Sequence, residues 1–182
     1  SLTIFGNLIN DKFVRRSSAK NSDYIYVSGT IGDSALGLHC KTKTRVNILK
    51  KHREFLLNRY LKPTPRIDLF NFINKNASAS TDISDGLYSD LNNICRTSNL
   101  GADIDFNAIP LSNSARTIIS VYPKLKKLIL NGGDDYELLF TGKDGLDRNK
   151  NITKIGKMKK GYNINIIDFD DITNLDGYKH KF

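Results

Sequence analysis

Residues 77–86 read ASASTDISDG and decide the fold, because they join a strand of small residues to a helix. The run Ala77–Ile83 lacks helical spacing and predicts a strand, and the following residues to Ser98 have helical spacing. Asp82 ends the strand, and Asp85 is placed to cap the helix. Both carboxylates are therefore expected to face one point beyond the end of the strand, where open α/β sheets bind ligands.

This stretch has the chemistry of a cation and phosphate site. Two carboxylates without nearby bases favour Mg²⁺, which takes phosphates and waters as its other ligands. Ser84 lies between them and is expected to donate to a phosphate oxygen, helped by the helix N-terminus. The alternative is local: Asp85 is then only a cap, and Asp82 only ends the strand.

Strands mixed with helices extend outward on both sides of this stretch. Apolar or alternating runs predict further strands at Ser1–Ile9, Tyr24–Ser28, Ala102–Phe106, Tyr136–Thr141, Asn151–Gly156 and Asn163–Asp168. Helical spacing predicts helices from Ser34 and over Val46–Tyr60, Arg66–Asn74, Asn113–Val121 and Lys124–Leu130. Because no strict strand–helix–strand period is present, we predict an α/β (α+β mixed) fold with a layered mixed sheet flanked by helices.

Two more clusters combine glycines with acidic residues. Residues 131–137 read NGGDDYE, where two glycines allow a tight turn and Asp134 and Asp135 precede an apolar strand. Residues 29–34 read GTIGDS and resemble a phosphate-binding loop, with Gly32 and Asp33 as its candidates. The alternatives are a polar turn before an edge strand and a simple strand–turn–helix. Gly32, Asp33 and Asp135 are accordingly the weaker candidates.

Composition excludes several classes of protein. The 182 residues are 39% hydrophobic and 26% charged, which suffices for a core and argues against disorder. No apolar run approaches the ~20 residues of a membrane span. The net charge of +9 comes from bases spread along the chain, so a solvated surface is favoured over nucleic-acid binding. Cys40 and Cys95 lack zinc or disulfide spacing and are expected to be buried in helices of a cytoplasmic protein.

Several stretches in order resemble the thiamine-monophosphate kinase family, of the aminoimidazole ribonucleotide synthetase and selenophosphate synthetase superfamily. They are DYIYVSGTIGDSALGL (23–38), PTPR (63–66), ASTDISDGL (79–87), IPLS (109–112), GGDDYEL (132–138) and GY (177–178). The resemblance implies Mg²⁺-dependent transfer of the ATP γ-phosphoryl group to thiamine monophosphate, which gives thiamine diphosphate.

The resemblance also implies roles for single residues. Asp82 and Asp85 match magnesium ligands, and Ser84 and Arg16 match ATP-binding positions. Asp134 and Tyr178 match positions that bind thiamine monophosphate, where a carboxylate can face the cationic thiazolium and an aromatic ring can stack on it.

The family's N-terminal half has no counterpart in the sequence. That half supplies further aspartates, a Gly-Gly-Asp-Thr segment and the sheet through which the enzymes form homodimers. Residues 1–14 resemble its last strand and a linker, and residues 15–182 the C-terminal domain. We therefore expect no turnover by this chain alone. The alternative functions are another ATP-dependent enzyme of the superfamily, or a non-catalytic basic binding module left by a truncated gene.

Overall fold

A six-stranded mixed sheet forms the centre of the protein. The computed structural model describes residues 3, 5–6, 8, 12–43 and 46–169. The strands are β1 (Tyr24–Ser28), β2 (Ala77–Asp82), β3 (Gly101–Asp105), β4 (Leu138–Gly142), β5 (Ile152–Lys159) and β6 (Ile164–Ile167). Their order is β2-β4-β1-β5-β3-β6, and the pairing is antiparallel except between β3 and β6. The predicted mixed α/β fold is confirmed.

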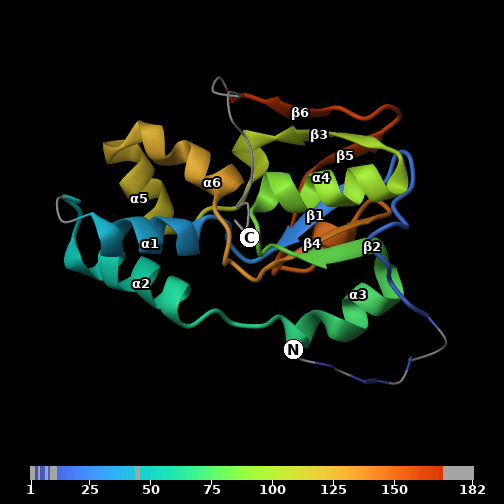
Figure 1. Ribbon diagram of the computed structural model, residues 1–182, viewed down its shortest axis with the longest axis horizontal. Helices are drawn as coiled ribbons and strands as arrows, with labels where there is room; N and C mark the ends of the chain where they lie inside the picture. The colour runs from blue at the N-terminus through green and yellow to red at the C-terminus, as the bar shows by residue number, and fades with distance from the viewer. Residues whose placement is uncertain (1–2, 4, 7, 9–11, 44–45, 170–182) are drawn as a thin grey trace.

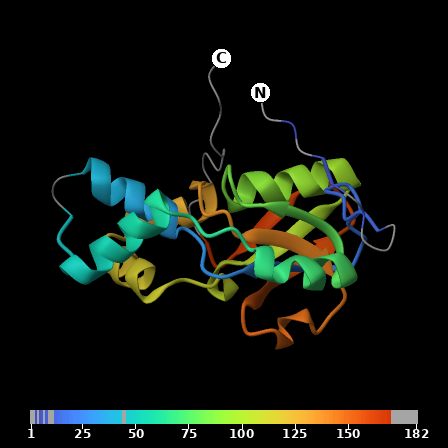
Figure 2. The same ribbon diagram turned by 90° about the horizontal axis from the view of Figure 1, so that it is seen from below.

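Six α-helices surround this sheet in two groups. They are α1 (Asp33–Thr42), α2 (Lys50–Leu61), α3 (Phe70–Asn76), α4 (Leu87–Ser98), α5 (Asn113–Val121) and α6 (Lys127–Asn131). α4 and α3 lie on opposite faces of the sheet, whereas α1, α2 and α5 gather beyond one of its ends (Figures 1 and 2). Between α2 and the 3₁₀ turn that precedes α3, residues 62–66 run without regular structure along the edge of the molecule (Figure 1).

The central strand β1 is buried on both faces, which explains its unbroken apolar sequence. Ile25 and Val27 belong to the larger core, which includes the apolar side of α4. Tyr26 belongs to a smaller core on the other face, where its ring stacks on Phe140 with 5.3 Å between centroids. The sheet is therefore held between two layers of apolar side chains.

Three expected helices differ from the observed ones. The helix predicted over Val46–Tyr60 begins only at Lys50, because the backbone at Leu49 is extended. The helix predicted over Arg66–Asn74 is a 3₁₀ turn, Ile67–Leu69, followed by α3. The helix predicted over Lys124–Leu130 is likewise a 3₁₀ segment, Pro123–Lys126, followed by α6. Spacing locates an apolar face but does not distinguish an α-helix from a tighter 3₁₀ start.

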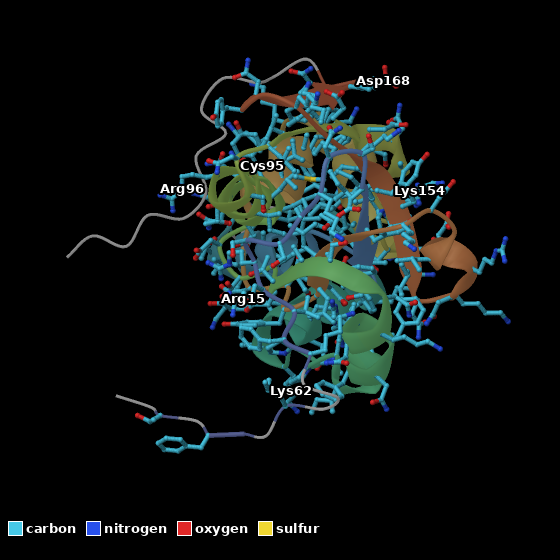
Figure 3. All side chains as sticks on the ribbon, turned by 90° about the vertical axis from the view of Figure 1, so that its right-hand side faces the viewer. Arg15, Lys62, Cys95, Arg96, Lys154 and Asp168 are labelled. Carbon is cyan, nitrogen blue, oxygen red and sulfur yellow. The ribbon has the colours of Figure 1, made fainter. Side chains whose placement is uncertain are left out.

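Both cysteines are buried in helices, as the sequence predicted. Cys40 and Cys95 are buried and free, and burial raises the pKa of the Cys95 thiol to about 11. Arg15 and Arg96 lie on one side of the molecule and Lys154 on the other (Figure 3). None of the helices within the described ranges is long and apolar enough to cross a bilayer. The strand expected over Ser1–Ile9 falls largely outside the described residues.

Candidate functional site

The two acidic stretches of the sequence meet at the end of β2. The backbone N–H of Asp134 donates to the Ser84 carbonyl at 3.0 Å, and that of Tyr136 donates to the Ile83 carbonyl at 2.9 Å. A Cβ on Gly133 would lie 2.1 Å from the Ser84 carbonyl oxygen, so this close approach requires glycine. The chain thus joins the loop after β2 to the loop before β4 through main-chain contacts.

Three predicted site carboxylates influence one tyrosine at this junction. Tyr136 has a φ of 52°, a left-handed conformation that is uncommon for residues other than glycine. Its pKa is raised by partial burial and then by the negative charges of Asp134, Asp82 and Asp85, and its hydroxyl hydrogen-bonds to Asp134. Asp82, Asp85 and Asp134 therefore all lie within electrostatic reach of the Tyr136 hydroxyl.

Asp85 does not cap α4, so that prediction is wrong. α4 begins at Leu87 after Gly86, and its N-terminus has no side-chain cap at the residue before it. Instead, buried Asp90 in the first turn accepts the N–H groups of Ser84 and Asp85, both at 3.0 Å. Burial raises the pKa of Asp90 to about 6, with smaller contributions from the charges of Asp85 and Asp82. The Asp85 side chain has no structural role as a cap.

Arg16 lies beside the end of β2 although 65 residues separate the two in sequence. Its Nη2 donates to Thr81 Oγ1 at 3.2 Å, and Thr81 Oγ1 lies 3.5 Å from Asp82 Oδ1. Arg16 is exposed, as is Asp82. The structure thus brings four residues to one edge of the sheet: exposed Arg16 and Asp82, and half-buried Ser84 and Asp85.

The weaker candidates form a buried network behind this edge. Asp135 accepts the N–H groups of Gly32 at 2.6 Å and Ser34 at 3.0 Å, and so caps the start of α1 from a distant segment. Burial raises the pKa of Asp135 to about 7. Asp33 is fully buried and accepts hydrogen bonds from Thr30 and Ser112. These three candidates are occupied by contacts within the chain.

A further buried carboxylate, Glu137, is not among the predicted residues. Ser28 Oγ donates to it at 2.6 Å, Arg59 Nη2 at 2.8 Å, and Arg66 through Nε at 2.6 Å and Nη2 at 2.5 Å. The sequence signal was a glutamate beside an apolar run, which requires a partner when buried. Its arginine partners are 71 and 78 residues away, so the sequence did not identify them.

A pocket of about 400 Å³ opens beside Asp82. It is lined by Pro63, Pro65, Arg66, Asp82, Tyr136 and Leu138. Within the described part of the chain, no three carboxylate, histidine or cysteine side chains come close enough to hold a metal by themselves. A pair of carboxylates still suits Mg²⁺, which is commonly bound through one or two carboxylates together with substrate phosphates.

The comparison with family models decides which group of proteins this is. Residues 20–147 match the model described as "AIR synthase related protein, C-terminal domain". The chain belongs to this family. The match includes β1, both acidic loops and the pocket residues, whereas Arg16 lies just before it.

The relatives of this AIR synthase-related domain include thiamine-monophosphate kinases. The chain is 36% identical over 181 residues to that of Buchnera aphidicola from Acyrthosiphon pisum, covering 97% of this chain and 53% of the relative. It is 40% identical over 142 residues to that of Salmonella typhimurium, covering 78% and 43%. The chain thus spans about half the length of the curated relatives it matches, and it corresponds to the C-terminal part of these kinases, as the sequence resemblance predicted.

Solved structures agree with this assignment. A structure described as AaThiL complexed with AMPPCP and TMP superposes with a TM-score of 0.82 at 35% identity, covering 94% of this chain and 55% of that one. Thiamine-monophosphate kinase from Stenotrophomonas maltophilia gives a TM-score of 0.79 at 32% identity, covering 88% and 54%. The Escherichia coli hydrogenase maturation protein HypE, at 13% identity and a TM-score of 0.61, covers 93% and 52% and shares the fold.

Proposed function

We propose that the chain supplies the C-terminal part of an ATP-dependent thiamine-monophosphate kinase. The reaction transfers the γ-phosphoryl group of ATP to the phosphate of thiamine monophosphate, and thiamine diphosphate is the product. The observation that carries this proposal is the junction at the end of β2, where main-chain hydrogen bonds join the loop of Asp85 to the loop of Asp134 and Arg16 hydrogen-bonds to Thr81 beside Asp82. The relative solved with AMPPCP and TMP supports it.

The charges at this edge suit transfer between two phosphorylated molecules. Such a reaction needs little covalent chemistry from the protein and depends on positioning and on neutralising phosphate charge. Asp82 and Asp85 would hold Mg²⁺, which when bound neutralises charge on the phosphate oxygens. Arg16 binds nucleotide phosphates, and the Ser84 hydroxyl donates to a phosphate oxygen. Each of these residues lies on the loop after β2 or beside it.

The thiazolium cation of thiamine monophosphate, the phosphoryl acceptor, is assigned to the loop before β4, which carries Asp134. Asp134 is exposed and faces the same junction, so its carboxylate can attract the thiazolium ring. Tyr178, proposed to stack on that ring, lies outside the described residues. We further propose a C-terminal domain over residues 15–182, a cytoplasmic location, and a homodimer in the complete enzyme.

The test is thiamine diphosphate formation from ATP, Mg²⁺ and thiamine monophosphate. The chain is assayed alone and with a complementing fragment, defined as the part of the Salmonella typhimurium kinase outside its match to this chain. We expect product only from the pair, because metal and nucleotide must be held from both sides. An Asp85→Asn chain with the same fragment is the control. A pair that associates but yields no product contradicts the proposed function, and product from the chain alone contradicts the expected need for both parts.

A further inference from the structure

Arg66 is the positively charged member of the six residues that line the pocket beside Asp82. It lies on the irregular segment between α2 and α3, directly after Pro65. Two prolines and Tyr136 give the pocket apolar walls, and Asp82 gives it a carboxylate. A single cation in a mostly apolar wall is suited to fix the position of an anionic group.

The Arg66 guanidinium is held in place before any ligand arrives. Its Nε and Nη2 bind the two carboxylate oxygens of Glu137 at 2.6 and 2.5 Å, in the paired geometry that guanidinium and carboxylate prefer. Glu137 also raises the pKa of Arg66, so the side chain stays charged. Among the described residues, none makes a hydrogen bond to Nη1, so its two N–H groups remain available as donors.

Glu137 is shared between Arg66 and a second arginine, Arg59. The same carboxylate oxygen, Oε1, also accepts a hydrogen bond from Arg59 Nη2 at 2.8 Å. Arg59 Nε is 3.6 Å from the second nearby carboxylate, Asp33. Glu137 and Asp33 together balance the two guanidinium charges, and Arg66, which is 22% exposed against 13% for Arg59, is the more accessible of the two arginines.

We propose that Arg66 binds a phosphate group in this pocket through its free nitrogen. The inference rests on the proposed function, since it places a phosphate beside Asp82, where that function places the metal. The phosphate belongs either to thiamine monophosphate or to the nucleotide, and both present the same oxygens to a guanidinium. Arg66 is then a phosphate-binding residue, and Glu137 is its positioning residue.

Arg59 provides a matched control. It is also an arginine, it binds the same carboxylate of Glu137, and it is 13% exposed. It comes from α2 and is absent from the residues that line the pocket. Replacing Arg59 therefore removes an equal charge and one contact of Glu137 without removing a donor from the pocket wall.

The experiment measures binding of three probes to the chain by calorimetry in the presence of Mg²⁺: thiamine monophosphate, thiamine and AMPPCP. We expect Arg66→Ala to weaken binding of at least one phosphorylated probe by roughly 10- to 100-fold, the range of a charge-assisted hydrogen bond, and to leave thiamine unchanged. A loss for thiamine monophosphate alone identifies the acceptor phosphate, and a loss for AMPPCP alone identifies the nucleotide. Arg59→Ala should leave the ratio of the affinities for thiamine monophosphate and thiamine as in the wild type.

Arg66→Lys is the control for misfolding of Arg66→Ala. It keeps the positive charge and should lose less affinity for the phosphorylated probes than Arg66→Ala. The inference is overturned if the wild-type chain binds no phosphorylated probe more tightly than thiamine. It is also overturned if Arg66→Ala binds all probes normally, or if it and Arg59→Ala lose all probes equally. Failure of the proposed function is separate: an Arg66-dependent phosphate preference with no product from the complemented pair leaves this site standing and removes the kinase assignment.

Discussion

The carboxylate of Asp90 accepts the backbone N–H of Ser84 at 3.0 Å, and this bond holds the loop after β2 in shape from inside the protein. The same oxygen accepts the N–H of Asp85. One buried side chain thus fixes two residues of the proposed phosphate and metal site. Its removal would leave both amides without this acceptor.

Asp90→Ala should destabilise the protein by about 1–3 kcal/mol, because the half-buried amides of Ser84 and Asp85 lose their shared acceptor and water replaces only part of it. Asp90→Asn retains one side-chain oxygen and should cost less. Urea unfolding of the two variants and the wild type measures their free energies of unfolding and checks this order of stability. Equal stability of Asp90→Ala and the wild type would show that the loop finds other acceptors.

Asp135 makes stability depend on pH in a defined direction. Its pKa in the folded protein is about 7, against 3.8 for the ordinary group, so the folded state retains the proton longer than the unfolded state. Stability from this group is therefore present at low pH and is lost as the pH rises from about 4 to 7. Its charged neighbours are Asp33, which raises the pKa, and Arg59, which lowers it.

The variant Asp135→Asn isolates that contribution. Its free energy of unfolding, compared with that of the wild type, should rise steadily between pH 4 and 7 and become constant above that range. Denaturant curves at half-unit steps of pH supply the comparison. Parallel pH profiles for the two proteins would mean that Asp135 does not titrate in this window.

Asp85→Asn should reduce turnover of the complemented pair by roughly 10²-fold or more, since charge stabilisation at the phosphates is the main catalytic contribution. The fold should be spared, because the Asp85 side chain does not cap α4. Steady-state rates and thermal unfolding are measured on the same preparations. Nearly wild-type activity would rule out the metal-ligand role.

Arg16→Ala should weaken the affinity of the pair for AMPPCP by roughly 10- to 100-fold and leave thiamine monophosphate affinity unchanged. The reason is that the hydrogen bond of Arg16 goes to Thr81 beside Asp82, and within the described residues no hydrogen bond joins Arg16 to the loop of Asp134. Calorimetry with both ligands makes the comparison. An equal loss for both ligands would indicate a general disturbance of the strand end.

Local sequence predicted the elements that local forces determine. The strand Tyr24–Ser28 and the helix Asn113–Val121 have the bounds expected from their apolar patterns, and the helix has the Ser112 side chain as its cap. The apolar pattern predicts the start of β4 at Tyr136, two residues before its observed start at Leu138. The left-handed backbone at Tyr136 delays the strand, and residue type alone does not reveal such a conformation.

The candidate site was predictable only in part. The acidic loops stood out because glycines and paired carboxylates are unusual beside strands. The network of Glu137 with Arg59 and Arg66 did not, because its members are distant in sequence and each resembles an ordinary surface charge. Similarly, Asp135 caps α1 although it is 101 residues away from Ser34 in the sequence.

The main-chain hydrogen bonds between the two acidic loops leave the site side chains free to evolve. The contacts of Asp134 and Tyr136 with Ser84 and Ile83 use amide and carbonyl groups that every residue except proline carries. Replacing Asp82, Asp85 or Asp134 therefore alters the chemistry at the junction while the loops keep their spacing. A library randomised at Asp82 and Asp85, and limited at Asp134 to residues that tolerate its left-handed backbone with a φ of 65°, should yield mostly folded proteins. It offers a starting point for selecting new acceptor molecules.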